Sequence, residues 1–398
     1  MRIDQEVIFV YFIGIDIAKY KHDCFIATET GEVVRNTFTF LNDRSGFQHL
    51  LSVIQDLDPT QIKRIGFEAT SHYTENLKRF ISQAGFDFME LNPVLTAKFR
   101  SATTLRRSKT DRMDAQLIAL YLMSVPYKPC PIPYYHISAL KSLTRLRASL
   151  VRQRSHHLVQ ITNLMDAIFP EFKPFFNHSF TVTALYLIEN YATPTKISNM
   201  NTKSYEILRR LSRGRFSCAK FLQLKTLAQQ SVGNSSHVLE LELASVLRLY
   251  RAVDEEIVRL ENEIKTIMAK HDIPTASIHG VGILSAASIV AEYGDFNRFE
   301  TPAQMLAYAG LEPSINQSGI TRSPGHMVKR GSSELRFVLL NVSIYLLIHN
   351  PVYYAFYQKK RNEGKSHRVA LSHIAKKLVR MIFKLEKEHL QFDMSQVR

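Results

Sequence analysis

Apolar and polar residues alternate in short runs over roughly the first hundred positions, and turn residues or polar stretches separate the runs. Alternation with a period of two is typical of β-strands, whereas apolar residues three and four apart indicate amphipathic helices. The pattern therefore predicts three successive strands followed by alternating helices and strands. The expected strands are residues 11–17, 22–28, 32–40, 61–68 and 86–91, and the expected helices are 44–57, 72–84 and one from Thr110.

The rest of the chain has mainly helical patterning. Residues 138–168 and 238–270 predict two long helices, and the second keeps a heptad of apolar residues over about three repeats. This stripe favours a coiled coil that joins two or more copies, or else a helical hairpin within one chain. The stretch 171–235 between them predicts short helices with a basic group, Arg209, Arg210, Arg213 and Arg215, in which we find no readable chemistry.

Four carboxylates stand at unusual places in this pattern: Asp16, Glu68, Asp111 and Asp114. Alternation places Asp16 and Glu68 on the strand faces opposite the large apolar residues. Asp111 and Asp114, three residues apart at a helix start, share a helix face. One interpretation is that they are unrelated, with the strand acids facing solvent and the helix acids favoured by the dipole. If neighbouring strands bring them together, each like-charge pair at about 4 Å costs on the order of 4 kcal/mol at an effective dielectric near 20.

Such a cluster persists mainly when cations neutralise it, and oxygen-only ligands favour Mg²⁺ or Mn²⁺. A site of this kind performs phosphoryl transfer. A three-strand meander followed by alternating strands and helices is also the order of an RNase H-like fold, in which such acids converge. The element order and the acids agree with each other.

The charge of the chain indicates a polyanionic partner. The 398 residues carry a net charge of +15 with a pI near 9.6. Residues 1–130 are nearly neutral at +1, whereas residues 131–273 and 274–398 each carry +7. Nucleic acid fits this excess, and no segment approaches the length of a membrane-spanning helix. The three scattered cysteines match neither a disulfide framework nor a zinc site, so we expect reduced thiols in a cytoplasm.

A basic stretch between Pro93 and Thr110 leads into the helix that carries the last two acids. We expect a loop here that holds a nucleic-acid backbone, or alternatively a merely solvated loop. The candidate contacts are Lys98, Arg100, Arg106, Arg107 and Lys109. The proline-rich stretch 126–133 then marks a domain boundary, so we expect domains at 1–130, 131–273 and 274–398.

The last expected domain contains two candidate phosphate-binding features. Gly280 and Gly282 precede a helix in the pattern of a helix–hairpin–helix, whose exposed N–H groups hold phosphate. A Ser/Gly/basic segment follows, in which Ser318 could attack a phosphodiester while cations stabilise the developing charge. Ser314 and Ser323 are rival nucleophiles, and the segment could instead be an ordinary phosphate-contact loop. Its candidate cations are Arg322, Lys329, Arg330 and Arg336.

Together these motifs resemble the DEDD transposases of bacterial insertion sequences, including Piv-type pilin-gene invertases and RNA-guided bridge recombinases. The similar motifs are Gly14-Ile-Asp-Ile-Ala-Lys19, Phe67-Glu-Ala-Thr70, Lys109-Thr-Asp-Arg-Met-Asp-Ala115, Leu306-Ala-Tyr-Ala-Gly310, Gln317-Ser-Gly319 and Lys329-Arg-Gly331. The resemblance runs from about residue 11 to 385. One departure is His279, where many members have proline before the Gly-x-Gly turn.

The resemblance implies a RuvC-like domain, a coiled-coil linker and a mostly helical transposase domain with a serine nucleophile. It implies that Asp16, Glu68, Asp111 and Asp114 bind divalent metal and that Ser318 forms a covalent phosphoserine link with DNA. Family members act as dimers or tetramers in which the acids of one subunit work with the serine of another. Some use a structured guide RNA, which would suit a sequence-indifferent protein surface.

Two other functions remain open from the sequence. A resolvase-type nuclease would use the four acids with water as the nucleophile, and the serine segment would only contact phosphate. A non-catalytic nucleic-acid-binding protein could also carry this fold, although acids at all four positions argue against it. Cleavage that persists after Ser318→Ala would indicate the nuclease.

Overall fold

The computed structural model describes residues 9–69, 73–103, 111–130, 135–234, 236–312, 317–318, 321–322 and 327–393; for residues 111–112, 135–136, 317–318 and 321–322 it describes the backbone only. By their internal contacts, the residues divide into two compact units, 1–132 and 133–398. The boundary lies in the proline-rich stretch where the sequence indicates one.

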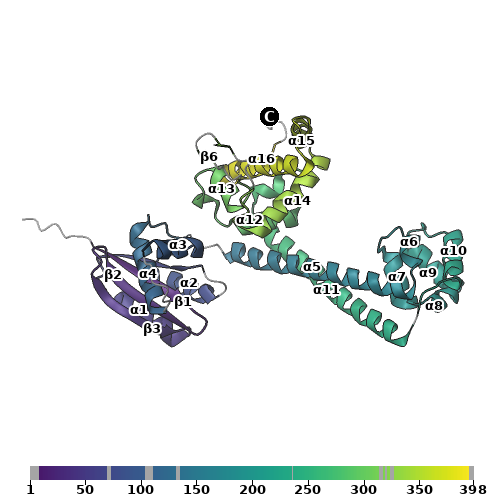
Figure 1. The fold of residues 1–398 in the computed structure, drawn as a ribbon, viewed down its shortest axis with the longest axis horizontal. Coiled ribbons are helices and arrows are strands. Elements are labelled where there is room, and N and C mark those ends of the chain that lie inside the picture. The colour runs from purple at the N-terminus through teal and green to yellow at the C-terminus, as the bar shows by residue number, and fades with distance from the viewer. Residues whose placement is uncertain are drawn as a thin grey trace, which may run out of the picture. The chain divides into compact units, whose positions relative to one another are not determined.

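A five-stranded mixed sheet forms the centre of the first unit (Figure 1). Its order is β3-β2-β1-β4-β5, with β1–β2 and β2–β3 antiparallel and β1–β4 and β4–β5 parallel. The strands are β1 (Val10–Ile17), β2 (Lys21–Thr28), β3 (Val33–Leu41), β4 (Ile62–Glu68) and β5 (Phe88–Leu91). All five predicted strands are therefore confirmed.

Helices cover both faces of this sheet. The face that carries Ile13, Ile15 and Phe67 packs on α1 (Arg44–Gln55) and α2 (Thr74–Gln83). The opposite face packs on α4 (Asp111–Ser124) through residues that include Phe12, Ile118 and Leu122. The alternation of apolar residues along β1 thus serves two separate cores, one on each side of the sheet.

The segment expected as a loop after Pro93 is instead largely helical, so that prediction is wrong for its first part. Helix α3 spans Pro93–Thr103. Asn92 begins it, because its side-chain oxygen accepts a hydrogen bond of 2.9 Å from the Val94 N–H. Proline in the first turn suits a helix start, and we overlooked this capping signal. Arg106, Arg107 and Lys109 lie outside the described residues.

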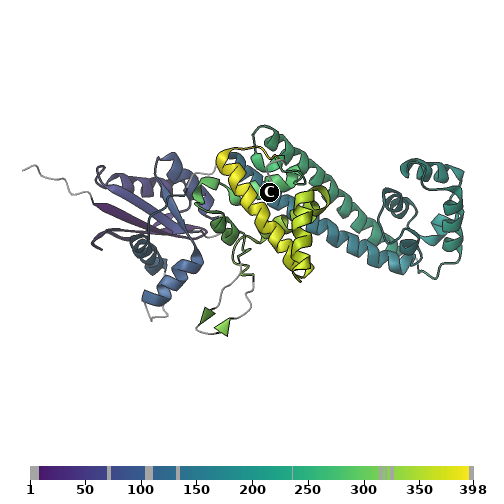
Figure 2. The same ribbon diagram turned by 90° about the horizontal axis from the view of Figure 1, so that it is seen from above.

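Two long helices, α5 (Tyr135–Ile168) and α11 (His237–Ala269), run side by side in the second unit (Figures 1 and 2). Arg147 pairs with Glu261 at 2.6 Å and Arg154 with Asp254 at 2.7 Å across them. Buried heptad residues of α11, such as Ile257, pack within this unit. The structure therefore has the two helices paired within one chain, and buried residues of the stripe pack in that pair.

One end of this helical pair belongs to the core of the C-terminal helices. Leu140, Ile264 and Met268 share a buried cluster with residues 278–385. For this reason the segments expected as separate domains on either side of residue 273 form one unit. The remaining helices of this core are α12 (Ile283–Tyr293), α13 (Pro302–Tyr308), α14 (Ser333–His349), α15 (Pro351–Asn362) and α16 (His367–Glu388), with 3₁₀ turns at Pro274–Ser277 and Phe296–Arg298.

The other end of the pair carries five short helices with a core of their own. Ile161, Met165, Leu243 and Leu247 from the long helices join it. We call residues 172–229 the helical insert. It consists of α6 (Phe172–Phe175), α7 (Val182–Tyr191), α8 (Pro194–Ser198), α9 (Thr202–Leu211) and α10 (Cys218–Gln229).

No described helix by itself has the length and apolar character needed to cross a membrane. Only α14 and α15 taken together would pass on length and composition, and they meet at a bend of 106°.

Candidate active site

The register of the sheet places Asp16 and Glu68 at neighbouring positions. Gly14 pairs with Gly66 and Ile15 with Phe67 across the parallel strands β1 and β4. One residue further along, Asp16 and Glu68 stand at the carboxyl ends of the two strands. Because side chains alternate, both acids share the face on which the glycines lie. This is the face that packs on α4.

The glycines on this face allow α4 to approach the sheet closely. A Cβ on Gly14 would lie 2.3 Å from the carbonyl oxygen of Ala115 and 2.5 Å from the backbone nitrogen of Ala119. Any side chain there would push the helix away. Ala115 directly follows Asp114, and Gly14 is two residues before Asp16. The contact therefore brings the start of α4 to the end of β1 that bears Asp16.

Helix α3 connects two of the acids directly. The hydroxyl of Thr96, which is fully buried, donates a short hydrogen bond to the Glu68 carboxylate. One helical turn later, the Nη2 of Arg100 pairs with Oδ1 of the buried Asp114 at 2.5 Å. Residues four apart share a helix face, with about 5–6 Å between their Cβ atoms. Glu68 and Asp114 therefore meet the same face of α3.

Asp111 is the first residue of α4, and its side chain lies outside the described part of the chain. The helical backbone places it on the same face as Asp114, one turn earlier. The structure thus brings together the positions of all four predicted acids, and it gives side-chain contacts for Glu68 and Asp114. Roles for these residues stay predictions.

A fifth carboxylate, Asp23, stands beside the cluster and was not among the predicted residues. It is the cross-strand partner of Asp16 in the antiparallel β1–β2 pair, so the two side chains share a face. Asp23 is buried, and it accepts a hydrogen bond of 2.5 Å from the Thr39 hydroxyl. The signal in the sequence was an acid inside an apolar strand, together with the meander that fixes this register.

The donor atoms at this site suit a hard divalent cation. Every acid contributes oxygen only, which is the preference of Mg²⁺ and Mn²⁺. The guanidinium of Arg100 lies against the Asp114 carboxylate, so this position already favours a positive charge. Among the described side chains, no three of the His, Cys, Asp and Glu type already converge as ligands. The residue types therefore suit a metal ion. To bind it, the Asp114 carboxylate would have to give up its ion pair with Arg100 and coordinate the metal instead.

The other predicted contacts in this unit have different surroundings. Lys98 is exposed on α3 and remains a predicted phosphate contact. Arg100 already has a carboxylate partner, so its guanidinium is engaged in holding Asp114.

Ser318 stands in a small hairpin of the second unit. The two-residue strands β6 (Gln317–Ser318) and β7 (Thr321–Arg322) are antiparallel, and Ser318 pairs with Thr321. Two residues connect them, so Ser318 is next to the hairpin tip. Figure 2 shows the two short strands extending from the C-terminal helices. Ser314 and Ser323, the rival nucleophiles, lie outside the described residues.

Backbone contacts join residues 308–312, before the hairpin, to residues 328–332, after it. We call these two stretches the base of the hairpin segment. The Val328 N–H donates to the Glu312 carbonyl at 2.9 Å, and the Ser332 N–H donates to the Tyr308 carbonyl at 3.0 Å. A Cβ on Gly331 would lie 2.3 Å from the Tyr308 carbonyl oxygen. Only glycine permits this approach, so both ends of the segment are fixed on the helical core.

The predicted cations at this base differ in their surroundings. Arg336 donates through Nη1 to the carbonyl oxygens of Ala309 at 3.2 Å and Lys329 at 3.4 Å. Arg336 therefore binds the two ends of the segment together. Lys329 and Arg330 are exposed. They and Arg322 remain predicted phosphate contacts.

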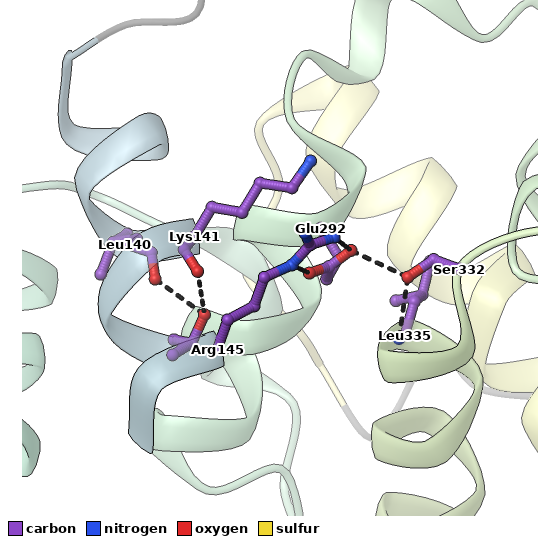
Figure 3. Close-up of polar contacts among 7 residues, drawn as sticks. Leu140, Lys141, Arg145, Glu292, Ser332 and Leu335 are labelled. Carbon is purple, nitrogen blue, oxygen red and sulfur yellow. Dashed lines mark hydrogen bonds and ion pairs between the residues drawn. The ribbon is translucent and has the colours of Figure 1, made fainter. Parts of the chain in front are cut away.

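A buried carboxylate, Glu292, ties this base to the long helices and was not predicted. Figure 3 shows Arg145 from α5 and Ser332, the residue before α14, pointing toward Glu292 from α12. Arg145 donates two bonds, of 2.6 and 3.0 Å, and the Ser332 hydroxyl donates one of 2.8 Å. Burial alone would raise the pKa of Glu292, but these bonds outweigh it and hold that pKa below its usual range. Ser332 also caps α14 by accepting from the Leu335 N–H.

The Gly-x-Gly turn precedes α12 as the sequence indicates. Gly280 has φ of +98°, a conformation that favours glycine. Gly282 begins α12 without a side-chain cap. The element before the turn is a short 3₁₀ turn, so only the second half of a helix–hairpin–helix is a regular α-helix. Phosphate contact here stays a prediction.

Comparison with known proteins gives the class of this chain. A family model described as "Transposase", of the DEDD type of insertion sequence IS110, matches residues 13–170. A second model, described as "Transposase IS116/IS110/IS902 family", matches residues 275–358. The first model covers the acidic cluster and the second covers the serine hairpin. The chain is a transposase, an enzyme of DNA cleavage and strand transfer.

Several relatives match nearly the full length. The chain is 22% identical over 387 residues to the "Insertion element IS116 uncharacterized 44.8 kDa protein" of Streptomyces clavuligerus, with 96% of each chain covered. It is 24% identical over 386 residues to the "Pilin gene-inverting protein" of Moraxella bovis, with 96% of this chain and 97% of that protein covered. The chain belongs to the IS116/IS110/IS902 family of DEDD transposases.

Proposed function

We propose that this transposase cleaves and rejoins DNA strands through a covalent bond between Ser318 and a DNA phosphate, assisted by a divalent metal ion. The observation that carries the proposal is the contact of α3 with both Glu68 and Asp114, next to the neighbouring strand ends of β1 and β4. Glu68 and Asp114 come from two separate elements, and Asp16 stands at the adjacent strand end. The sheet order supports an RNase H-like domain, the RuvC-like type, in which acids of this kind bind metal.

The carboxylates of Asp16, Glu68, Asp111 and Asp114 would hold the cation, Mg²⁺ or Mn²⁺. When bound, such a cation polarises the scissile phosphate and assists the attacking and leaving oxygens. Thr96 orients the Glu68 carboxylate, and Arg100 holds Asp114 in place until a cation takes over.

Ser318 supplies the attacking oxygen. Its Oγ forms a bond to phosphorus and gives its proton to a nearby base, while the bond from phosphorus to the leaving sugar oxygen breaks. That sugar oxygen takes up a proton as it leaves. The phosphodiester energy is conserved in the new serine–phosphate bond, so a second strand can reverse the step. No high-energy cofactor is then needed.

The partners follow from the same proposal. DNA is the substrate, and a homo-oligomer, a dimer or a tetramer, lets acids and serines of several copies act together. A structured guide RNA would supply the sequence specificity that a basic protein surface does not. The excess positive charge of residues 131–398 supports a polyanionic partner.

The test of the serine role is capture of a protein–DNA adduct on a nicked substrate in the presence of Mg²⁺ or Mn²⁺. We expect the adduct in the wild-type chain and none with Ser318→Ala. Ser314→Ala and Ser323→Ala, which change the two rival nucleophiles, are matched controls that should retain it. Adducts that survive Ser318→Ala would show that another side chain is the nucleophile. Cleavage without any adduct in the wild type would favour the water-dependent nuclease instead.

The metal role has a separate readout. Calorimetric titration with Mn²⁺ should show binding to the wild-type chain and at least tenfold weaker binding to Asp114→Asn, since one anionic ligand is lost. Glu75→Gln, an exposed acid on α2, is the control and should bind normally. Equal affinity in all three proteins would contradict the assignment.

A further inference from the structure

The helical insert carries the net positive charge of residues 131–273. Residues 172–229 contain nine Lys or Arg and two Asp or Glu. The remainder of residues 131–273, which is mainly α5 and α11, contains ten of each kind. The charge of +7 that belongs to this region therefore lies entirely on the insert.

The cations of the two regions also differ in their partners. On α5, Arg147 and Arg154 pair with acids of α11. In the insert, Lys196 pairs with Glu240 at 2.6 Å, and Lys225 donates to the Met200 carbonyl at 2.7 Å. The arginines near the end of α9 differ from these cations. Within the part of the chain that the structure describes, four exposed arginines at the end of α9 form no ion pair: Arg209, Arg210, Arg213 and Arg215.

These arginines stand on one tightly closed segment, residues 209–215, which we call the arginine turn. The Gly214 N–H donates to the Arg209 carbonyl at 2.8 Å, and the Arg213 N–H donates to the Arg210 carbonyl at 3.0 Å. This pair of bonds is the common way to end a helix with a left-handed residue. The buried Leu208 and Phe216 anchor the segment on both sides. The backbone that carries the arginines is therefore fixed.

The turn also contains an unusual backbone conformation. Arg213 has φ of +53°, in the left-handed region where glycine is the common residue. A residue with a side chain costs roughly 1–2 kcal/mol more there than glycine. Such strain tends to be kept where the side chain has a role. A Cβ on the next residue, Gly214, would meet nothing within 4 Å, so the turn opens to solvent.

We propose that the arginine turn binds the phosphate backbone of a nucleic acid. The planar guanidinium group matches phosphate oxygens with two parallel hydrogen bonds, and four such groups on a rigid turn can follow successive phosphates. The first turn of α10 lies next to it, and Lys220 adds a further exposed cation there. Contacts of this kind position a nucleic acid without reading its sequence. The arginine turn consists of residues other than the acids and Ser318, so the inference goes beyond the proposed function.

The first experiment compares two variants with the same charge change in the full-length chain. One is Arg209→Gln/Arg210→Gln/Arg213→Gln/Arg215→Gln. The control is Arg248→Gln/Arg259→Gln/Lys265→Gln/Lys270→Gln, which removes four exposed cations of α11 and its end. Affinity for a fluorescent duplex DNA and for an RNA hairpin is measured by anisotropy over a series of salt concentrations.

The turn variant should bind on the order of tenfold more weakly than the control at low salt, at least for one of the two nucleic acids. For duplex DNA, the loss of four phosphate contacts lowers the salt slope by up to about 3.6, because each contact contributes about 0.9. An effect confined to DNA or to RNA identifies the ligand. Both variants are first shown to be folded by circular dichroism. Equal affinities and slopes in the two folded variants would overturn the proposal.

The second experiment uses a thiol that the chain places beside the turn. Cys218 begins α10 and is exposed, whereas Cys24 is buried and Cys130 half-buried. Saturating nucleic acid should slow alkylation of Cys218 in the wild-type chain and leave it unchanged in the turn variant, as read by mass spectrometry. An unchanged rate in the wild type would also overturn the proposal. Neither experiment requires catalysis, so both are informative even if Ser318 is not the nucleophile.

Discussion

The acidic cluster and the serine hairpin, the two sites of the proposed reaction, are held in place in two different ways. In the N-terminal unit, Asp16 and Glu68 stand on strands whose glycines let α4 pack directly on the sheet. In the second unit, Ser318 stands beside the tip of a two-strand hairpin whose ends are fixed to the helical core. The first arrangement fixes the acids through packing along the whole element. The second is fixed at the base, where residues 308–312 and 328–336 are bonded to one another.

This difference suits the two tasks. Metal ligands must hold like charges near one another, so their supporting elements must resist separation. A nucleophile has to reach a phosphate that approaches from outside. The contrast predicts that changes in packing damage the acidic cluster most, and that changes at the hairpin base have smaller and pH-dependent effects.

The largest expected effect is that of Gly14→Ala. The added Cβ would overlap the backbone of α4 at Ala115 and Ala119, so the helix must shift. We expect a loss of about 3 kcal/mol in the stability of the first unit, measured by hydrogen exchange of the amides of β1 and α4. Gly282→Ala is the control, because a Cβ there meets nothing within 4 Å and its φ is −68°. Equal losses would mean that packing does not set the position of α4.

A smaller effect is expected for Glu292→Gln, which removes the buried charge at the hairpin base. The loss of bonds to a charged partner is expected to cost about 2 kcal/mol at pH 7. The folded pKa of Glu292 lies below the ordinary value of 4.5, so its contribution is full above that pH and disappears as pH falls through the folded pKa. Denaturant unfolding at pH 7 and at pH 3 measures it.

The difference between wild type and Glu292→Gln should therefore shrink toward zero in acid. A difference that stays constant with pH would show that the charge is not what stabilises the base. Glu334→Gln, an acid in the first turn of α14, is a suitable control with the same chemical change.

The smallest effect is expected for Thr96→Val, which keeps the shape of the side chain and removes the donor to Glu68. We expect a loss of about 1 kcal/mol in the stability of the first unit. Thr103→Val on the same helix is the control, because its hydroxyl is exposed and donates only to its own helix backbone. If the two variants lose the same stability, Thr96 does not orient Glu68.

The sequence predicted the sheet and the two long helices because strand alternation and heptads are local patterns. The four acids could be found for the same reason, since each breaks such a pattern. Asp23 was missed although the meander that pairs it with Asp16 is a local pattern. The contacts of Glu292 could not be found, because they depend on partners such as Arg145, 147 positions away. The start of α3 was missed although the Asn92 cap is a local signal. The core of the helical insert depends on residues of α5 and α11 and has no strong period of its own.

The helical pair of α5 and α11 has one further consequence. It is anchored in one core near Leu140 and in another near Met165, so its length sets the spacing between those cores. A helix rises about 1.5 Å per residue, so seven residues added to both helices would lengthen this arm by about 10 Å with little change of rotation. The length of the pair therefore fixes how far the helical insert stands from the C-terminal core, and an insertion in only one of the two helices would disturb their pairing.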